Sequence, residues 1–104
     1  GAVNRFLRYE ETHDGSYGIY SAYDATAIDC ILKGGAYAYT GFRAFNCVFL
    51  ATSISCYDDN MFVGCLFPML DLSAHTKING TSYPWVMASG CIDINGYYNS
   101  PPKP

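Results

Sequence analysis

The feature that most constrains the fold is a repeat of 17 to 18 residues, marked by Cys30, Cys47 and Cys65. In each repeat, apolar residues stand two positions before and two positions after the cysteine: Ile28 and Leu32, Phe45 and Phe49, Val63 and Phe67. Alternation with a period of two is typical of a β-strand with one buried face. The residue just before each cysteine, Asp29, Asn46 or Gly64, is therefore expected to point outward.

A second strand is predicted upstream of each cysteine strand, at about residues 19–21, 36–38 and 54–56. Turn-forming Gly, Asp and Asn residues separate the two strands at 23–24, 40–41 and 58–60. A crossover helix would need a longer repeat of about thirty residues. We therefore predict an all-β solenoid in which equivalent positions stack about 4.8 Å apart. Three buried rows follow from this stacking: Cys30, Cys47 and Cys65; Ile28, Phe45 and Val63; Leu32, Phe49 and Phe67.

The repeat weakens toward the C-terminus, where Cys91 follows Cys65 by 26 residues. An inserted loop or hairpin near 68–85 accounts for the difference, with Asn79-Gly80 as its tight turn. Ile92 and Ile94 suggest that the buried face changes in this last repeat. The predicted organisation is an N-terminal cap or first strand at 1–16, the repeat domain at 17–98, and a proline-rich flexible tail at 99–104.

Composition limits the classes of partner. Charged residues make up 14% of the chain and the formal net charge is −3, which argues against nucleic acid as a partner. No apolar run reaches the length needed for membrane insertion, and the N-terminus has no signal-peptide pattern. The five cysteines are an odd number without a C-x-x-C spacing, so we expect buried thiols formed in a reducing cytoplasm.

Aromatic residues supply the candidate binding surface. The chain has 10 tyrosines, and a tyrosine combines a flat apolar face with a polar hydroxyl. The aromatic residues expected to point outward are Tyr20, Tyr23, Tyr37, Tyr39 and Phe42. Such a surface suits either a sugar chain or a subunit interface. Trp85, in the insert, is either a platform for a sugar or a plug that packs the insert onto the core.

Acidic residues supply the candidate catalytic groups. Asp58, Asp59 and Asn60 form the densest acidic turn, and Asp24 is expected beside them from the preceding repeat. Paired carboxylates can cleave a glycosidic bond or bind Ca²⁺, although Asp and Asn also serve as ordinary turn residues. No cofactor is otherwise indicated. The cluster of Glu10, Glu11, His13 and Asp14 is expected to be a solvated loop, and His75 a structural or solvated residue.

The segments 17–21, 27–31 and 44–49 resemble the cysteine-stacked coils of pectate-lyase-like right-handed parallel β-helix proteins, especially those of bacteriophage tail spikes and related bacterial surface proteins. The resemblance covers about residues 17 to 67. It implies a right-handed parallel β-helix of about four rungs, a homotrimer, and recognition of bacterial surface polysaccharide by a virion tail component. No catalytic motif of a member family is matched.

Three functions remain open at this level. The first is a structural and receptor-binding module of a tail spike or fibre that binds bacterial surface glycan. The second is a fragment of a polysaccharide depolymerase, a hydrolase or lyase, that uses Asp24, Asp58 or Asp59. The third is a structural protein that assembles end to end into filaments.

Overall fold

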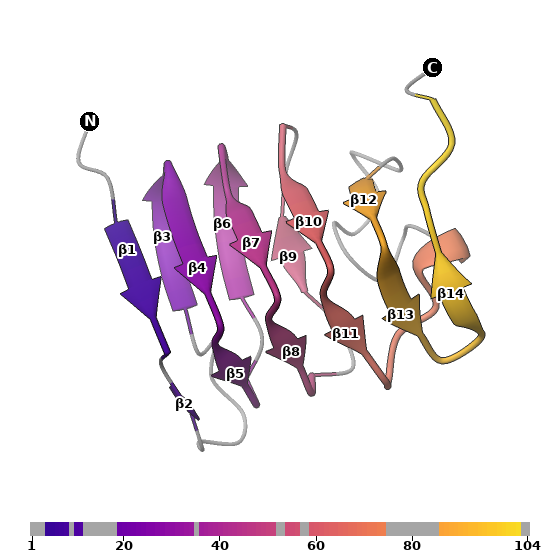
Figure 1. Ribbon diagram of the computed structural model, residues 1–104. Helices are drawn as coiled ribbons and strands as arrows, with labels where there is room; N and C mark the ends of the chain where they lie inside the picture. Colours follow the sequence, from indigo (N-terminus) through magenta and orange to yellow (C-terminus); the bar gives the residue numbers. More distant parts are fainter. Residues whose placement is uncertain are drawn as a thin grey trace.

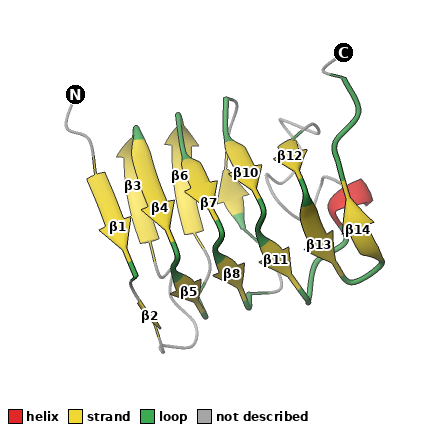
Figure 2. Ribbon diagram, in the orientation of Figure 1, coloured by secondary structure: helices red, strands yellow, loops and turns green. Residues whose placement is uncertain are grey.

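The regular structure of the described part of this chain is almost entirely β-strand. The computed structural model describes residues 4–8, 10–11, 19–34, 36–51, 54–56, 59–74 and 86–102. Within these ranges the helical structure is one 3-10 turn, η1 (Leu72–Ala74), shown in red in Figure 2. The prediction of an all-β chain is confirmed.

The strands form three sheets, arranged as rows of stacked arrows in Figure 1. Sheet A contains β1 (Asn4–Leu7), β4 (Ala25–Ile28), β7 (Arg43–Phe45), β10 (Met61–Val63) and β12 (Met87–Ser89). Sheet B contains β2 (Glu10–Glu11), β5 (Ile31–Leu32), β8 (Val48–Phe49), β11 (Leu66–Phe67), β13 (Cys91–Asp93) and β14 (Gly96–Tyr98). Sheet C contains β3 (Ile19–Tyr23), β6 (Ala36–Thr40) and β9 (Ser55–Cys56).

Successive repeats pair strand to strand in parallel, and each described repeat from β3 to β11 visits sheets C, A and B in that order. Ala27 pairs with Ala44, and Ala44 pairs with Phe62. Leu32 likewise pairs with Phe49. The repeat of 17 to 18 residues read from the cysteines is therefore the structural repeat. The antiparallel pair of β13 and β14 is the exception at the C-terminal end.

A row of residues with left-handed backbone separates sheet A from sheet B. Their φ angles lie between 51° and 62°, and the row consists of Arg8, Asp29, Asn46, Gly64 and Gly90. Asn, Asp and Gly adopt this conformation more readily than other residues. Each bend splits the strand expected around a cysteine into two short strands. The predicted outward direction of Asp29, Asn46 and Gly64 is confirmed, since all three are exposed.

The bend also overturns one of the three predicted buried rows. Ile28, Phe45 and Val63 are only half-buried. The residues one position earlier, Ala27, Ala44, Phe62 and Ala88, are buried in their place. The prediction assumed unbroken alternation from Ile28 to Leu32, but a left-handed residue between them rotates the chain and shifts the inward face by one position.

The other two predicted rows are confirmed and form the core. Leu32, Phe49 and Phe67 are fully buried, and Cys91 extends the buried row of Cys30, Cys47 and Cys65. The rings of Phe49 and Phe67 stack with centroids 5.0 Å apart and planes 6° apart. Phe62 contacts both rings edge-on. The prediction that Phe42 points outward is also wrong. Phe42 is fully buried and packs edge-on against Phe49 and Phe62.

The buried face does not change in the last repeat, so that prediction is wrong as well. Cys91 is buried, whereas Ile92 and Ile94 are exposed. Asp93 occupies the position equivalent to Phe67 and is buried. Its carboxylate accepts hydrogen bonds from the backbone N–H groups of Leu72 and Asn95, both at 2.8 Å. A polar residue is accepted at this core position because backbone donors meet both of its oxygens.

The C-terminal residues close one end of the sheets. The strand β14 pairs with β13, and the Ser100 hydroxyl accepts from the Ala88 N–H at 2.9 Å. Asn99 accepts from the Gly90 N–H at 2.7 Å. Asn99 and Ser100, assigned to the flexible tail from the sequence, are therefore hydrogen-bonded to the last repeat. In the predicted insert, Leu70 and Leu72 are buried in the core, while the Asn79-Gly80 turn lies outside the described residues.

Candidate functional site

The best-defined polar site lies at the bend between sheets C and A. Asp24, Gly41 and Asp59 occupy equivalent places there, and all three have left-handed φ angles of 52°, 76° and 57°. A side chain at position 41 would collide with Asp24, because a Cβ atom on Gly41 would lie 2.4 Å from the Asp24 carboxylate oxygen. The Asp24 carboxylate therefore lies directly over the backbone of the next repeat. We call Asp24, Gly41, Arg43, Asp59 and Asn60 the corner site.

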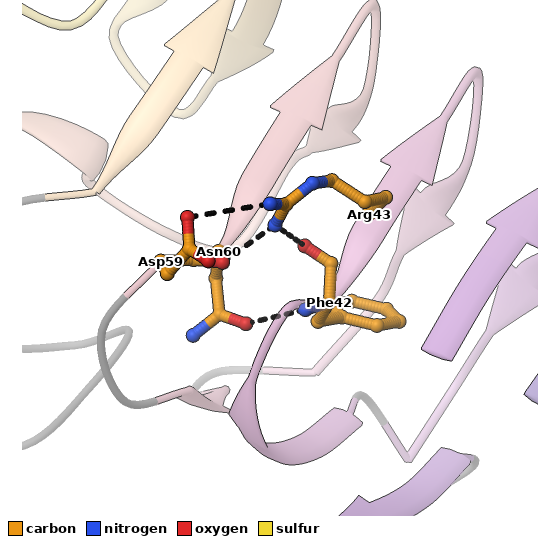
Figure 3. Close-up of polar contacts among 4 residues, drawn as sticks. All are labelled: Phe42, Arg43, Asp59 and Asn60. Atoms are coloured by element: carbon orange, nitrogen blue, oxygen red, sulfur yellow. Dashed lines mark hydrogen bonds and ion pairs between the residues drawn. The ribbon is translucent and has the colours of Figure 1, made fainter. Parts of the chain in front are cut away.

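Asn60 holds the corner site together from inside (Figure 3). Its side chain is buried, and its Oδ1 atom accepts a hydrogen bond of 2.8 Å from the Phe42 N–H. The Gly41 N–H donates to the Asp59 carbonyl at 3.0 Å. Two successive bends are thus tied by a buried amide and a backbone hydrogen bond. Of the roles considered for Asn60, this geometry corresponds to turn chemistry.

Arg43 places a cation in the middle of the corner site. Its guanidinium donates to the carbonyl oxygens of Phe42 at 3.2 Å and Asp59 at 2.5 Å. It also pairs with the Asp59 carboxylate at 3.3 Å, with both side chains partly exposed (Figure 3). Arg43 was not among the predicted site residues. Its place in the sequence could have indicated it, because Arg43 follows the Thr40-Gly41 turn, which lies between the two acidic turns.

The two described aspartates of the corner site are not direct neighbours. The Gly41 repeat lies between Asp24 and Asp59, so the expectation that they lie on adjacent repeats is wrong. Two strand spacings separate their backbones, roughly 10 Å. Asp58 lies outside the described residues. In the part of the chain that the structure describes, no three His, Cys, Asp or Glu side chains gather in a way that could hold a metal ion.

The tyrosines are placed by strand register. Tyr20 pairs with Tyr37, which in turn pairs with Ser55, so Tyr20 and Tyr37 occupy equivalent positions on neighbouring strands of sheet C. Tyr23 pairs with Thr40, and Tyr39 lies in β6 beside it. The side chains of these four tyrosines, and the whole of Trp85, lie outside what the structure describes. His13, Asp14 and His75 also lie outside the described residues, whereas Glu10 and Glu11 form β2.

A separate cavity of about 440 Å³ lies at the N-terminal end of the stack. Leu7, Arg8, Ile28 and Asp29 line it. Arg8 and Asp29 are equivalent residues of the left-handed row, so the cavity combines opposite charges with two aliphatic side chains. This cavity was not predicted, because the spacing of residues in the sequence does not show that Arg8 is the next member of the left-handed row that contains Asp29.

The buried thiols form a continuous hydrogen-bonded row. The Sγ atom of Cys47 lies 3.4 Å from the Ala27 carbonyl oxygen of the preceding repeat, and Cys65 and Cys91 make the equivalent contacts with Ala44 and Phe62. Cysteine is therefore a weak donor at the bend as well as a small apolar residue. Hydrogen bonds with Cys47 and Cys91 raise the pKa of Cys65, and burial raises it further. The same hydrogen bonds lower the pKa of Cys47 and Cys91, against the opposing effect of burial.

We expect the thiols of this row not to react with thiol reagents in the folded protein. Four free cysteines are buried, so a thiol reagent such as DTNB reaches no more than one of the five thiols until the chain unfolds. A lowered pKa does not change this, because the sulfur atoms are inaccessible. The measurement is the number of thiols that react before and after addition of urea. A Cys56→Ala variant serves as the control, and rapid reaction of two or more native thiols would contradict the prediction.

Tyr98 and Asp93 are two polar residues near the C-terminal end of the stack. The Tyr98 hydroxyl is buried and has no hydrogen-bond partner among the described residues. Burial raises the pKa of Tyr98, and the charges of Asp93, Asp71 and Cys91 raise it further. Both Asp93 oxygens accept hydrogen bonds from backbone donors, so the role that the structure gives this carboxylate is structural.

No protein-family model, curated protein or solved structure matches this chain. Among the described residues, no helix has the length and apolarity that a membrane span requires. The corner site and the strand register are therefore the basis for assigning a function.

Proposed function

We propose that the chain is a short right-handed parallel β-helix that serves as a structural and receptor-binding module of a phage-like tail spike or fibre, in contact with bacterial surface polysaccharide. The observation that carries this proposal is the stacking of equivalent positions into straight rows. Tyr20 stands in register with Tyr37, and Asp24 stands in one row with Asp59. A surface whose groups repeat at a constant spacing suits a ligand that is itself a repeating polymer.

The chemistry of the corner site suits a sugar. The partly exposed Arg43 guanidinium and the exposed Asp24 and Asp59 carboxylates offer donors and acceptors side by side. Sugar hydroxyls both donate and accept hydrogen bonds, so they can use both kinds of group. The charge of Arg43 offsets that of Asp59, so the corner site keeps one net negative charge, that of Asp24, which disfavours a highly anionic ligand.

The test is binding of the purified chain to a panel of bacterial capsular polysaccharides and O-antigens. We expect at least one to bind, and Arg43→Ala to weaken that binding about tenfold or more through loss of a charged hydrogen bond. The ion pair contributes only about 0–1 kcal/mol, but Arg43→Ala also loses two hydrogen bonds to backbone carbonyl oxygens, so circular dichroism must verify that the variant is folded. Lys33→Ala removes the same charge from the exposed residue that follows β5, away from the corner site, and should bind like the unaltered chain. Absence of binding across the panel would refute the receptor role.

A depolymerase is the second candidate. The backbones of Asp24 and Asp59 lie roughly 10 Å apart, a spacing from which the two carboxyl groups could reach the separation of about 6.5–9.5 Å found in inverting glycosidases. The same panel tests this candidate through the release of reducing sugar ends. Activity that disappears in folded Asp24→Asn and Asp59→Asn variants would establish an enzyme. If the viscosity of the polysaccharide solution stays unchanged and no new reducing ends appear, the depolymerase is refuted and the binding module remains.

End-to-end filaments, the third candidate, have less support. The edge of β13 is taken by β14, and Ser100 bonds to the edge of β12. Stacking through these edges would require both contacts to break. Synthesis in a reducing cytoplasm, before the module reaches a virion tail or another extracellular surface, is consistent with four buried free thiols. We further propose that the module is a homotrimer.

A further inference from the structure

The outer face of sheet B carries a continuous row of apolar side chains. Strand register places one residue from each of five of the six strands in this row: Ile31, Val48, Leu66, Ile92 and Tyr97. Leu66 is 37% exposed, Ile92 47% and Tyr97 74%. The neighbouring residues Leu32, Phe49 and Phe67 point into the core, so the row faces away from it. We call these five residues the outer row.

A second set of apolar side chains widens this surface. Leu50 and Ile94 directly follow the inward-pointing Phe49 and Asp93, and both are exposed, as is Met69. Their backbones are fixed in the stack, since the Leu50 N–H donates to Leu32 and the Ile94 N–H donates to Leu70, both at 2.9 Å. The exposed side chains therefore belong to an ordered surface.

The size of this apolar surface points to an interface. If each of these residues presents roughly 150–200 Å² when fully exposed, their exposed fractions together amount to on the order of 500–700 Å², backbone and the Tyr97 hydroxyl included. The largest apolar patch of a typical monomer is about 300–600 Å². A stable protein–protein interface buries about 800 Å² on each partner. The surface is thus at the upper end of what a monomer exposes and approaches what one subunit contributes to a complex.

We propose that copies of this chain associate through the outer row of sheet B. The five positions of the row hold no charged or hydroxyl-rich group apart from the Tyr97 phenol, so the row offers little to a sugar chain or a charged partner. An apolar partner surface is required, and the same row on a second copy supplies one of equal length and spacing. At the N-terminal end, the register position next to Ile31 is Glu10, which marks where the apolar row ends.

This inference deepens the oligomeric part of the proposed function and does not depend on glycan binding. Each subunit would bury its outer row and leave the corner site, on the bend between sheets C and A, available for ligand. Flat apolar sheet faces are prone to aggregation when they stay uncovered. Association between copies removes that exposure in a defined way.

The experiment is the mass of the full chain in solution, measured by light scattering after size exclusion. We expect a trimer for the unaltered chain and a monomer for Ile92→Lys, which places a charge at the most exposed aliphatic position of the row. Ser89→Lys is the matched control, because it adds the same charge at an exposed position of sheet A and should leave the mass unchanged. Far-UV circular dichroism verifies the fold of each variant.

A milder substitution protects the test against misfolding. Ile92→Thr keeps the β-branched side chain that strands favour and should weaken association about tenfold or more, as a concentration-dependent mass. An unaltered chain that stays monomeric at high concentration, or variants at Ile92 that keep its mass, would overturn the interface. A dimer would support the interface and refute the trimer. Assembly without glycan binding would refute only the receptor role, and glycan binding by a monomer only the interface.

Discussion

Phe49→Ala is expected to lower the free energy of unfolding by about 3–5 kcal/mol, enough to leave a chain of this size barely folded. Phe49 is fully buried at the centre of the phenylalanine cluster. Its ring stacks on Phe67 and meets Phe62 edge-on at 5.6 Å and Phe42 edge-on at 6.4 Å. Truncation leaves a cavity among three rings that come from sheet A, from sheet B and from the bend between sheets C and A, so collapse around it is limited.

The measurement is urea unfolding followed by circular dichroism, at a protein concentration held constant because association also stabilises the folded state. Phe45→Ala is the matched control, since it removes the same side chain from a half-buried position in the same repeat. We expect Phe45→Ala to cost less than half as much. Equal losses for the two variants would show that the described core is not the one that stabilises the fold.

Asp93→Leu is expected to cost about 2–4 kcal/mol, although it restores the apolar pattern of the row that contains Leu32, Phe49 and Phe67. The substitution leaves the buried N–H group of Leu72 and the partly buried N–H group of Asn95 without their acceptor. The loss of these two bonds outweighs the gain from one more buried aliphatic side chain, about 1.5–3 kcal/mol when fully realised, because the site is built around a carboxylate. Asp93→Asn keeps one acceptor oxygen and should lose less.

The same urea experiment measures the stability of the Asp93 variants, and amide hydrogen exchange locates the damage. Exchange at Leu72 and Asn95 should accelerate in Asp93→Leu before exchange in the central repeat does. Asp29→Asn is the control, because Asp29 is exposed and its neighbour in the left-handed row is already Asn46. If Asp93→Leu is as stable as the unaltered chain, apolar packing rather than hydrogen bonding governs this end of the stack.

Much of the fold could be read from the spacing of the cysteines. When two neighbouring repeats pair in parallel, all their equivalent residues are the same number of positions apart in the sequence. The spacings between Cys30, Cys47 and Cys65 therefore revealed which residues stack. The row of Leu32, Phe49 and Phe67 followed from the same rule and is confirmed. The row of Ile28, Phe45 and Val63 did not hold, because the rule of alternation fails wherever one residue adopts a left-handed backbone.

The corner site was only partly visible in the sequence. Asp24, Asp59 and Asn60 were recognisable as turn residues, which is how their left-handed φ angles and the Asn60 hydrogen bond use them. Their mutual placement required the register, which puts the Gly41 repeat between the two aspartates. Arg43 was not predicted, because no local motif links it to its partners. It donates to the carbonyl oxygen of the preceding residue, Phe42, and to that of Asp59, which lies 16 positions further along the chain.

The all-β class, the repeat length, the burial of the thiols and the turn residues at the bends follow from the order of the residues alone, because each depends on local conformational preference or on a period along the chain. The inward-facing positions next to each bend, the burial of Phe42 and Asp93, and the apolar outer row of sheet B became visible only in the folded molecule. These features depend on the angle at which the chain turns from one sheet to the next. That angle is set by the contacts between repeats, which bring together residues that are distant in the sequence.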